Sequence, residues 1–231
     1  MPAQNQPERT SGGQPAYLTG LRLLALFCLA VLLVATSVFV YATFIERSSA
    51  PAVVDQSADS DRGTALDPPR QLTDFTLTSQ SGAPLRLSDL RGKYVLLFFG
   101  YSHCPDVCPT TLSDFVLAKR GLSTLASQVR FVFVSVDGAR DTPPVLTRFL
   151  SSFDPSFVGL QGDDTTLGQI GKEYGLFYQR EQVAGTSQPY MVTHSSSSYL
   201  IDRAGRLRMV YHFGTPPKLI ASDIADLYAH E

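Results

Sequence analysis

The sequence predicts an α/β fold, and three observations carry that prediction. The segments KYVLLFFG and VRFVFVSVD are continuous apolar runs, as in strands that are buried on both faces of a sheet. Segments with apolar residues at helical spacing follow each of these runs. A later pair of strand-like segments is joined by a short turn. With 231 residues, of which 44% are apolar, the chain can build a real core.

The elements come in an order that narrows the fold class. A short hairpin is expected around Ser81 and Gly82, and the first buried strand then ends at Gly100. Pro109 stands near the start of a helix, which leads to the second buried strand. Two helices, a second hairpin and a closing helix complete the chain: PPVLTRFLSSF, TTLGQIGKEYG, SYLID with LRMVYHF, and PPKLIASDIADLYAH. This order is typical of a thioredoxin-like sandwich, a central mixed sheet flanked by helices.

The N-terminal part predicts a membrane anchor. Residues 23–45 form an uncharged apolar run, long enough to span a bilayer as a single helix and too long for a cleaved signal peptide. Residues 1–22 read as a disordered cytoplasmic tail, and the polar residues 46–70 as a flexible linker. The thioredoxin-like domain is then expected over residues 71–231.

The placement of basic residues sets the orientation. Arg22 abuts the start of the apolar run, with only Arg47 as its rival on the other side, so the positive-inside rule places the domain outside the cytoplasm. The tail holds Arg9 and Glu8 and is unlike an Arg-rich transit peptide, which favours the plasma (inner) membrane of a bacterium. The net charge of −2 leaves no basic surface for nucleic acid, so no nucleic-acid partner is expected.

Two of the three cysteines form the candidate site. Cys28 lies within the predicted span, where it reads as a small apolar residue. Cys104 and Cys108 follow the first buried strand, at the strand end where open α/β sheets collect ligands. If the turn runs on into the helix, both sulfurs point to one side, and the helix N-terminus favours thiolates. Soft thiolates prefer Cu(I) or Zn among the common metals.

Two sulfurs leave a metal site short of ligands, and His194 is the candidate third. It precedes a predicted strand, in a loop that a thioredoxin fold brings over the cysteine turn, and its sequence surroundings offer it no amphipathic role. Other roles suit the remaining histidines better: His103 is expected to point away from the cysteine pair, His212 ends a predicted strand and His230 is next to the C-terminus.

Three motifs then reveal a resemblance. GYSHCPDVCPTTL resembles the signature of the Sco/SenC family of copper-delivery proteins for cytochrome c oxidase assembly, and the similarity continues through VSVDGARDTPPVL and HSSSSYLIDRAG. The resemblance implies a membrane-anchored copper chaperone that binds one copper ion, as Cu(I) or Cu(II), through Cys104, Cys108 and His194. It implies delivery to the dinuclear copper centre in the copper-site subunit of the oxidase, with a copper donor and a thiol reductant as further partners.

The resemblance also directs attention to the segment after the second buried strand. Asp137 corresponds to an acidic residue near the family's site, and we expect it to support the site or to add a ligand to Cu(II). For Asp141, a turn role is expected. Gly138 stands where the family usually has Pro, and the segment before His194 differs from the family in detail.

Other functions for the cysteine pair stay open. We expect a metallochaperone rather than an enzyme. The alternative is an extracytoplasmic thiol-disulfide reductase that uses Cys104 and Cys108 as a redox-active pair and acts on cysteines of the oxidase copper site or of other proteins. The usual redox motif has two intervening residues, and this one has three. A peroxidase is disfavoured because Tyr101 occupies the position of its Thr. An inert disulfide would close only a tiny loop, and three ligands are one short of a structural zinc site.

Overall fold

The computed structural model describes residues 26, 29, 31–39, 41, 63–182 and 189–230. Residues 31–39 are helical and expose their side chains. They belong to the predicted span 23–45, of which residues 26, 29 and 41 are also described. The rest of that span, including Cys28, and the predicted tail lie outside the described residues. Among the helices that the structure describes, none combines the length and the apolar character needed to cross a membrane.

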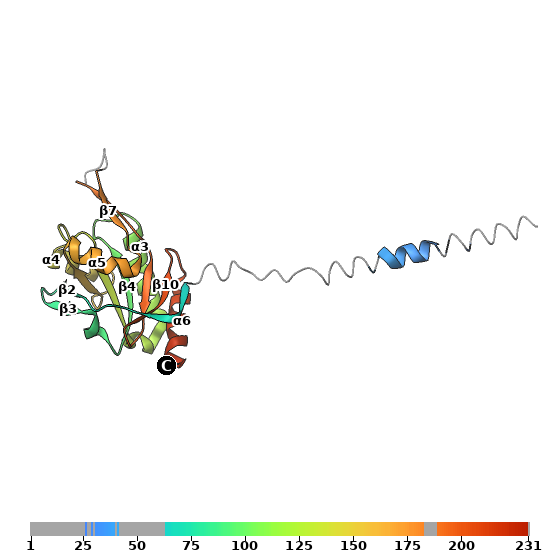
Figure 1. The fold of residues 1–231 in the computed structure, drawn as a ribbon, viewed down its shortest axis with the longest axis horizontal. Coiled ribbons are helices and arrows are strands. Elements are labelled where there is room, and N and C mark those ends of the chain that lie inside the picture. Colours follow the sequence, from blue (N-terminus) through green and yellow to red (C-terminus); the bar gives the residue numbers. More distant parts are fainter. Residues whose placement is uncertain are drawn as a thin grey trace, which may run out of the picture. The chain divides into compact units, whose positions relative to one another are not determined.

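The second part of the chain contains the α/β body (Figure 1). Within the described residues its strands are β1 (Thr64–Gln71), β2 (Thr76–Ser79), β3 (Pro84–Arg86), β4 (Tyr94–Gly100), β5 (Val129–Ser135), β6 (Val158–Gln161), β7 (Tyr178–Glu181), β8 (Met191–His194), β9 (Ser198–Ile201) and β10 (Arg206–Tyr211). Its helices are α3 (Val107–Leu122), α4 (Pro143–Ser151), α5 (Asp164–Tyr174) and α6 (Pro217–His230), with short 3-10 turns η1 (Leu87–Leu90) and η2 (Ser123–Gln128).

One mixed sheet organises this body. Its strand order is β1-β10-β9-β4-β5-β6-β2-β3, and β7 pairs with β8 in a separate two-stranded sheet. The pairs β4–β5 and β5–β6 are parallel, whereas the pairs of β4 with β9, β9 with β10 and β10 with β1 are antiparallel. The predicted thioredoxin-like sandwich with a central mixed sheet is confirmed.

The central strands are buried because their side chains are apolar on both faces. All seven residues of β4 are buried, and only one residue of β5 is exposed. The ring of Phe98 packs against the rings of Phe115, from α3, and Phe133, from β5. This packing joins β4 to α3, the two elements between which the cysteine loop lies.

The structure corrects the predicted linker at its C-terminal end. Residues 64–70, expected to be part of a flexible linker, belong to β1 and pair with β10. The linker was predicted from the polar composition of residues 46–70, and Pro68 and Pro69 are unfavourable inside a strand because proline cannot donate a ladder hydrogen bond. In β1, however, they lie at an irregularity of the pairing on an edge strand, where that donor is not required. Residues 46–62 of the predicted linker lie outside the described residues.

A second difference is the β7–β8 hairpin, which was not predicted. Tyr178 pairs with His194 and Arg180 with Val192, so His194 ends a strand instead of lying in a plain loop. The hairpin projects from the body in Figure 1, at the top of the view. It therefore delivers His194 to the site on an element of its own.

Candidate metal centre

The two cysteines come from adjoining segments at the end of β4. Cys104 lies in the loop between β4 and α3, and its backbone N–H donates to the carbonyl of Tyr101 at 3.3 Å. Cys108 is the second residue of α3 and is fully buried, whereas Cys104 is half-buried. The Cys108 backbone N–H donates to Cys104 Sγ at 3.4 Å. The helix N-terminus thus faces the Cys104 sulfur and favours its negative charge.

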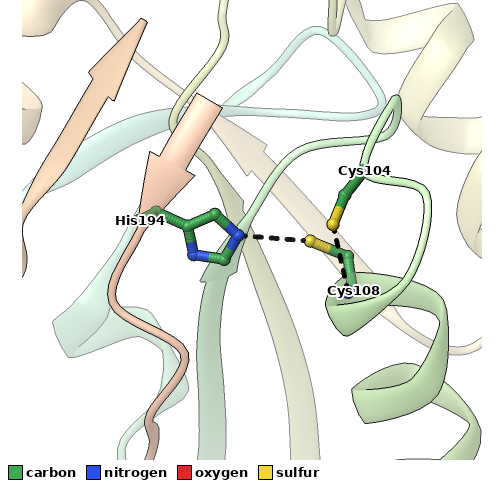
Figure 2. Close-up of side chains that lie close together, drawn as sticks. All are labelled: Cys104, Cys108 and His194. Carbon is green, nitrogen blue, oxygen red and sulfur yellow. Dashed lines mark hydrogen bonds between the residues drawn. The ribbon is translucent and has the colours of Figure 1, made fainter. Parts of the chain in front are cut away.

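His194 completes the group from the other side (Figure 2). Its Nε2 lies 3.5 Å from Cys108 Sγ. Its Nδ1 lies 2.8 Å from the carbonyl oxygen of Ser195. Because a carbonyl oxygen can only accept, Nδ1 donates a proton to it, so Nε2, which faces the sulfurs, is the ring nitrogen that can bind a metal. Metal-bound histidines in proteins are commonly oriented in this way.

Together these side chains form the one group of three or more potential ligands found among the described residues. The Sγ atoms of Cys104 and Cys108 and a ring nitrogen of His194 all lie within 4.8 Å of one another. The rings of Phe98 and Tyr101 meet the imidazole edge-on, at 5.9 and 5.8 Å between ring centres. One side of the site is therefore a rigid apolar wall.

The two sulfurs differ in charge. A hydrogen bond from the Cys108 thiol is the largest cause that lowers the pKa of Cys104, to about 4. The same hydrogen bond and burial raise the pKa of Cys108 well above its ordinary value. At neutral pH the pair holds one thiolate and one thiol, so a metal that binds both sulfurs must displace a proton from Cys108.

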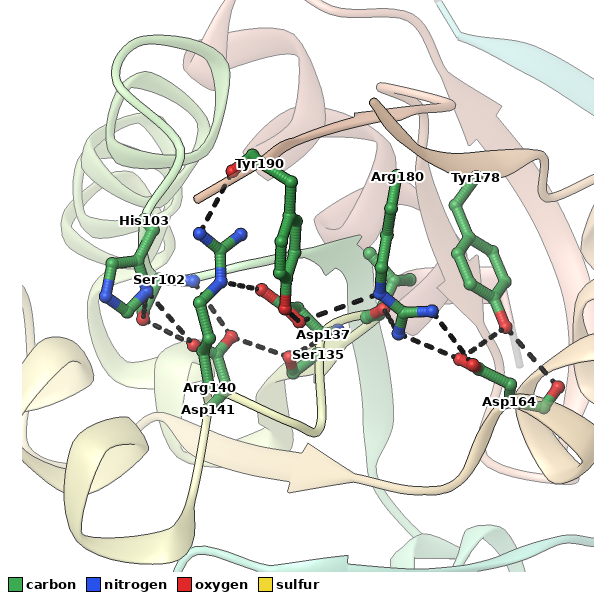
Figure 3. A network of polar contacts seen from close by, with 11 residues as sticks. Ser102, His103, Ser135, Asp137, Arg140, Asp141, Asp164, Tyr178, Arg180 and Tyr190 are labelled. Atoms are coloured by element: carbon green, nitrogen blue, oxygen red, sulfur yellow. Dashed lines mark hydrogen bonds and ion pairs between the residues drawn. The ribbon is translucent and has the colours of Figure 1, made fainter. Parts of the chain in front are cut away.

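The acidic residues of the neighbouring loop lie outside this group. Asp137 and Asp141 are fully buried. The Asp137 carboxylate accepts from the Tyr190 hydroxyl at 2.7 Å and from Arg140 (Figure 3). As the structure places it, Asp137 touches a residue of the segment leading into β8, which is consistent with the expected supporting role.

Asp141 has contacts beyond the turn role that was expected for it. Its carboxylate accepts from the backbone N–H of Ser102 at 2.9 Å and from the Ser135 hydroxyl at 2.6 Å. It thereby ties the cysteine loop to the end of β5. His103 lies beside Asp141, with Nδ1 3.7 Å from its Oδ1, and stays outside the ligand group.

Sequence reasoning missed Arg140 and Tyr190. The guanidinium of Arg140 lies 3.9 Å from the centre of the Tyr190 ring, and its Nη1 donates to the Tyr190 carbonyl at 3.1 Å. These residues are 50 positions apart. The basic residue within the GARDT motif was a signal that could have identified Arg140, whereas nothing in the local pattern around Tyr190 marked it.

Comparisons with known proteins show which family this chain is similar to. The family model SCO1/SenC matches residues 64–229. An SCO2-like protein of Rickettsia prowazekii is 33% identical over 157 residues, which cover 68% of this chain and 75% of that protein. The structure of Bradyrhizobium japonicum ScoI with copper bound is 35% identical, has a TM-score of 0.61, and covers 68% of this chain and 98% of its own. The apo Sco1 protein of Thermus thermophilus is 38% identical with a TM-score of 0.63, covering 71% and 95%.

Proposed function

Because this chain belongs to the SCO1/SenC family, we propose that it is a copper chaperone that delivers one copper ion to the dinuclear copper centre of cytochrome c oxidase during assembly. The ligands are Cys104, Cys108 and His194. The observation that carries the proposal is the convergence of two sulfurs and a ring nitrogen within 4.8 Å. Bradyrhizobium japonicum ScoI, which has copper bound, and BsSco, described as a member of the Sco family of cytochrome c oxidase assembly proteins, support it.

The ligand set suits a cargo that must be released. Two thiolates and one imidazole match the preference of Cu(I) for soft ligands and low coordination. Cys104 is half-buried and His194 is partly exposed, so ligands of an acceptor can approach the ion and replace these side chains one at a time. Cu(II) would need further oxygen donors in a tetragonal arrangement. A Cys104–Cys108 disulfide cannot bind the ion, so the pair has to be reduced first.

A Cu(I) competition titration tests the ligand set. Under anaerobic, reducing conditions we expect one tightly bound equivalent for the wild type, loss of tight binding in Cys104→Ser and Cys108→Ser, and clearly weaker binding in His194→Ala. His212→Ala is the matched control, because His212 is exposed and lies outside the ligand group. Wild-type affinity in His194→Ala would remove His194 from the site.

A thiol-disulfide reductase is the second candidate, and the asymmetry of the two sulfurs favours it. The Cys104 thiolate would attack a disulfide of a target protein, forming a mixed disulfide and releasing one target thiol. Cys108, after losing its proton, would then attack the Cys104 sulfur, which releases the second target thiol and leaves a Cys104–Cys108 disulfide. An external dithiol would have to reduce that disulfide in each cycle.

The two candidates differ in what they require of His194. Reduction of a disulfide in the copper-site domain of the oxidase should survive His194→Ala and stop in Cys104→Ser, whereas tight copper binding needs both residues. A protein that reduces that disulfide rapidly and binds no Cu(I) would be a reductase.

We propose further that residues 23–45 anchor the chain in the plasma (inner) membrane as a single-pass helix, with the α/β body outside the cytoplasm. The uncharged run and Arg22 at its start support this placement. The protein should stay with membranes after a carbonate wash, and protease added outside spheroplasts should digest the body. Release by carbonate would reject the anchor, and protection of the body would reverse the orientation.

A further inference from the structure

The loop of residues 137–141, after β5, contacts both segments that carry the copper ligands. On one side, Asp141 accepts from the backbone and the hydroxyl of Ser102, two residues before Cys104. On the other side, Asp137 accepts from the Tyr190 hydroxyl, four residues before His194. Both carboxylates are fully buried, so their positions depend on these partners. Figure 3 shows the loop between the two segments.

Tyr190 is held at three separate points. Its hydroxyl donates to Asp137 Oδ1 at 2.7 Å, its backbone carbonyl accepts from Arg140 Nη1 at 3.1 Å, and its ring lies against the Arg140 guanidinium at 3.9 Å. Arg140 in turn pairs with the Asp137 carboxylate. Contacts to the hydroxyl, the ring and the backbone together determine where the chain enters β8.

The same arginine also reaches the wall behind His194. The Arg140 guanidinium lies 5.6 Å from the centre of the Tyr101 ring, and the Tyr101 ring meets the His194 imidazole edge-on. The Arg140 side chain is only 13% exposed, so it is held by its surroundings. It therefore links the start of β8 to the aromatic surface on which His194 rests.

We infer that Arg140 and Tyr190 are positioning residues for the copper site, which hold His194 within ligand distance of Cys104 and Cys108 before the metal arrives. The inference rests on the proposed function, since it concerns the same site. The hairpin is a separate two-stranded sheet, and an isolated hairpin is marginally stable, so its position depends on contacts with the body, of which those of Tyr190 lie nearest the start of β8. A site that is formed in only a fraction of the molecules loses affinity in proportion to that fraction.

The sharpest variant is Tyr190→Phe, which keeps the ring against Arg140 and removes only the hydroxyl. A hydrogen bond to a charged group is among the stronger ones, so we expect Cu(I) affinity to fall by about tenfold. The loss cannot exceed that of His194→Ala, because the support acts through His194. Tyr178→Phe is the matched control, because it removes a hydroxyl from β7, the other strand of the hairpin. That hydroxyl lies 3.3 Å from its two acceptor oxygens on Asp164, at the surface.

The measurement is an anaerobic Cu(I) competition titration on the full chain in detergent, arranged as a double-mutant cycle. Tyr190→Phe should weaken binding in the wild-type background and have no further effect in His194→Ala. An unchanged affinity, or an equal loss in both backgrounds, would overturn the inference. If Tyr190→Phe does not fold, Arg140→Lys replaces it, since lysine keeps the charge and loses the planar group that stacks on the ring.

A readout without copper separates this inference from the proposed function. In the apoprotein, Tyr190→Phe should speed hydrogen exchange of the amides of residues 191–194 several-fold, and Tyr178→Phe should not. If exchange is faster in Tyr190→Phe but the wild type binds no Cu(I), the copper proposal is rejected, and the conclusion that Tyr190 supports β8 stands. Unchanged exchange would reject the positioning role, whatever the protein binds.

Discussion

Gly100, the last residue of β4, is the position where one added methyl group tests the packing around the candidate metal centre. A Cβ atom at this position would lie 2.8 Å from Cys108 Sγ, 2.8 Å from the ring of Phe133 and 2.9 Å from the ring of Phe98. Both rings are buried and packed against each other, so they cannot move aside freely. Gly100→Ala is therefore expected both to strain the core and to displace Cys108.

The size of both effects follows from these distances. Adding a methyl group to a well-packed core costs about 1–3 kcal/mol of the free energy of unfolding. For a body of this size, 1 kcal/mol corresponds to roughly 2–4 °C, so the Tm should fall by roughly 2–12 °C. An ordinary contact is about 3.5–4.0 Å, so the Cys108 sulfur must retreat by roughly 1 Å. Metal–ligand distances tolerate about 0.2 Å, so Cu(I) affinity should fall by about tenfold or more.

Thermal unfolding of the reduced apoprotein, followed by circular dichroism, and a Cu(I) competition titration measure the two effects. Gly168→Ala is the control, because Gly168 is exposed within α5 and its added methyl group would meet nothing within 4 Å. That variant should gain about 0.5–1 kcal/mol and keep its Cu(I) affinity. A Gly100→Ala protein with wild-type Tm and wild-type Cu(I) affinity would refute the described packing of Cys108 against the end of β4.

Three further predictions concern the thiols, the core and the pH dependence. In reduced apoprotein at pH 6, iodoacetamide should alkylate Cys104 and spare Cys108, because the pKa of Cys104 is lowered to about 4 and that of Cys108 is raised. Peptide mass spectrometry measures the labelling, and equal labelling of both cysteines would contradict this prediction. Leu97→Ala removes a fully buried side chain of β4 and should cost about 2–5 kcal/mol in urea unfolding, whereas Leu117→Ala, 51% exposed on α3, should stay within about 0.5 kcal/mol of the wild type. The hydrogen bond from the Ser88 hydroxyl holds the pKa of Asp74 below its ordinary value. The stability that this bond contributes is full above the unfolded-state pKa and is lost as the pH falls through the folded-state pKa. Ser88→Ala should therefore destabilise the protein more at pH 7 than at pH 2, and an equal loss at both would show that the carboxylate is not involved.

The strands that could be predicted are those whose own apolar residues and flanking turns indicate a strand. β4 and β5 are apolar throughout, and the hairpin of β9 and β10 is joined by a short turn, so pattern and turn chemistry identify them. β1 contains two prolines and is mostly exposed, and its identity as a strand comes from its pairing with β10. β7 and β8 have four residues each, too few for a periodic signal, and they depend on each other for their hydrogen bonds.

The sequence by itself determined the chemistry of the candidate site. Two cysteines four positions apart at the end of a buried strand, with a histidine before a later strand, offer two soft sulfur donors and one imidazole as candidate ligands, because residue type and local spacing are properties of the chain alone. Only the tertiary structure decided how these groups meet. His194 is 86 residues from Cys108 and reaches it on a hairpin whose start is held by Arg140 and Tyr190. Such contacts join segments that are distant in the chain, and no local pattern of apolar and polar residues specifies which of them lie side by side.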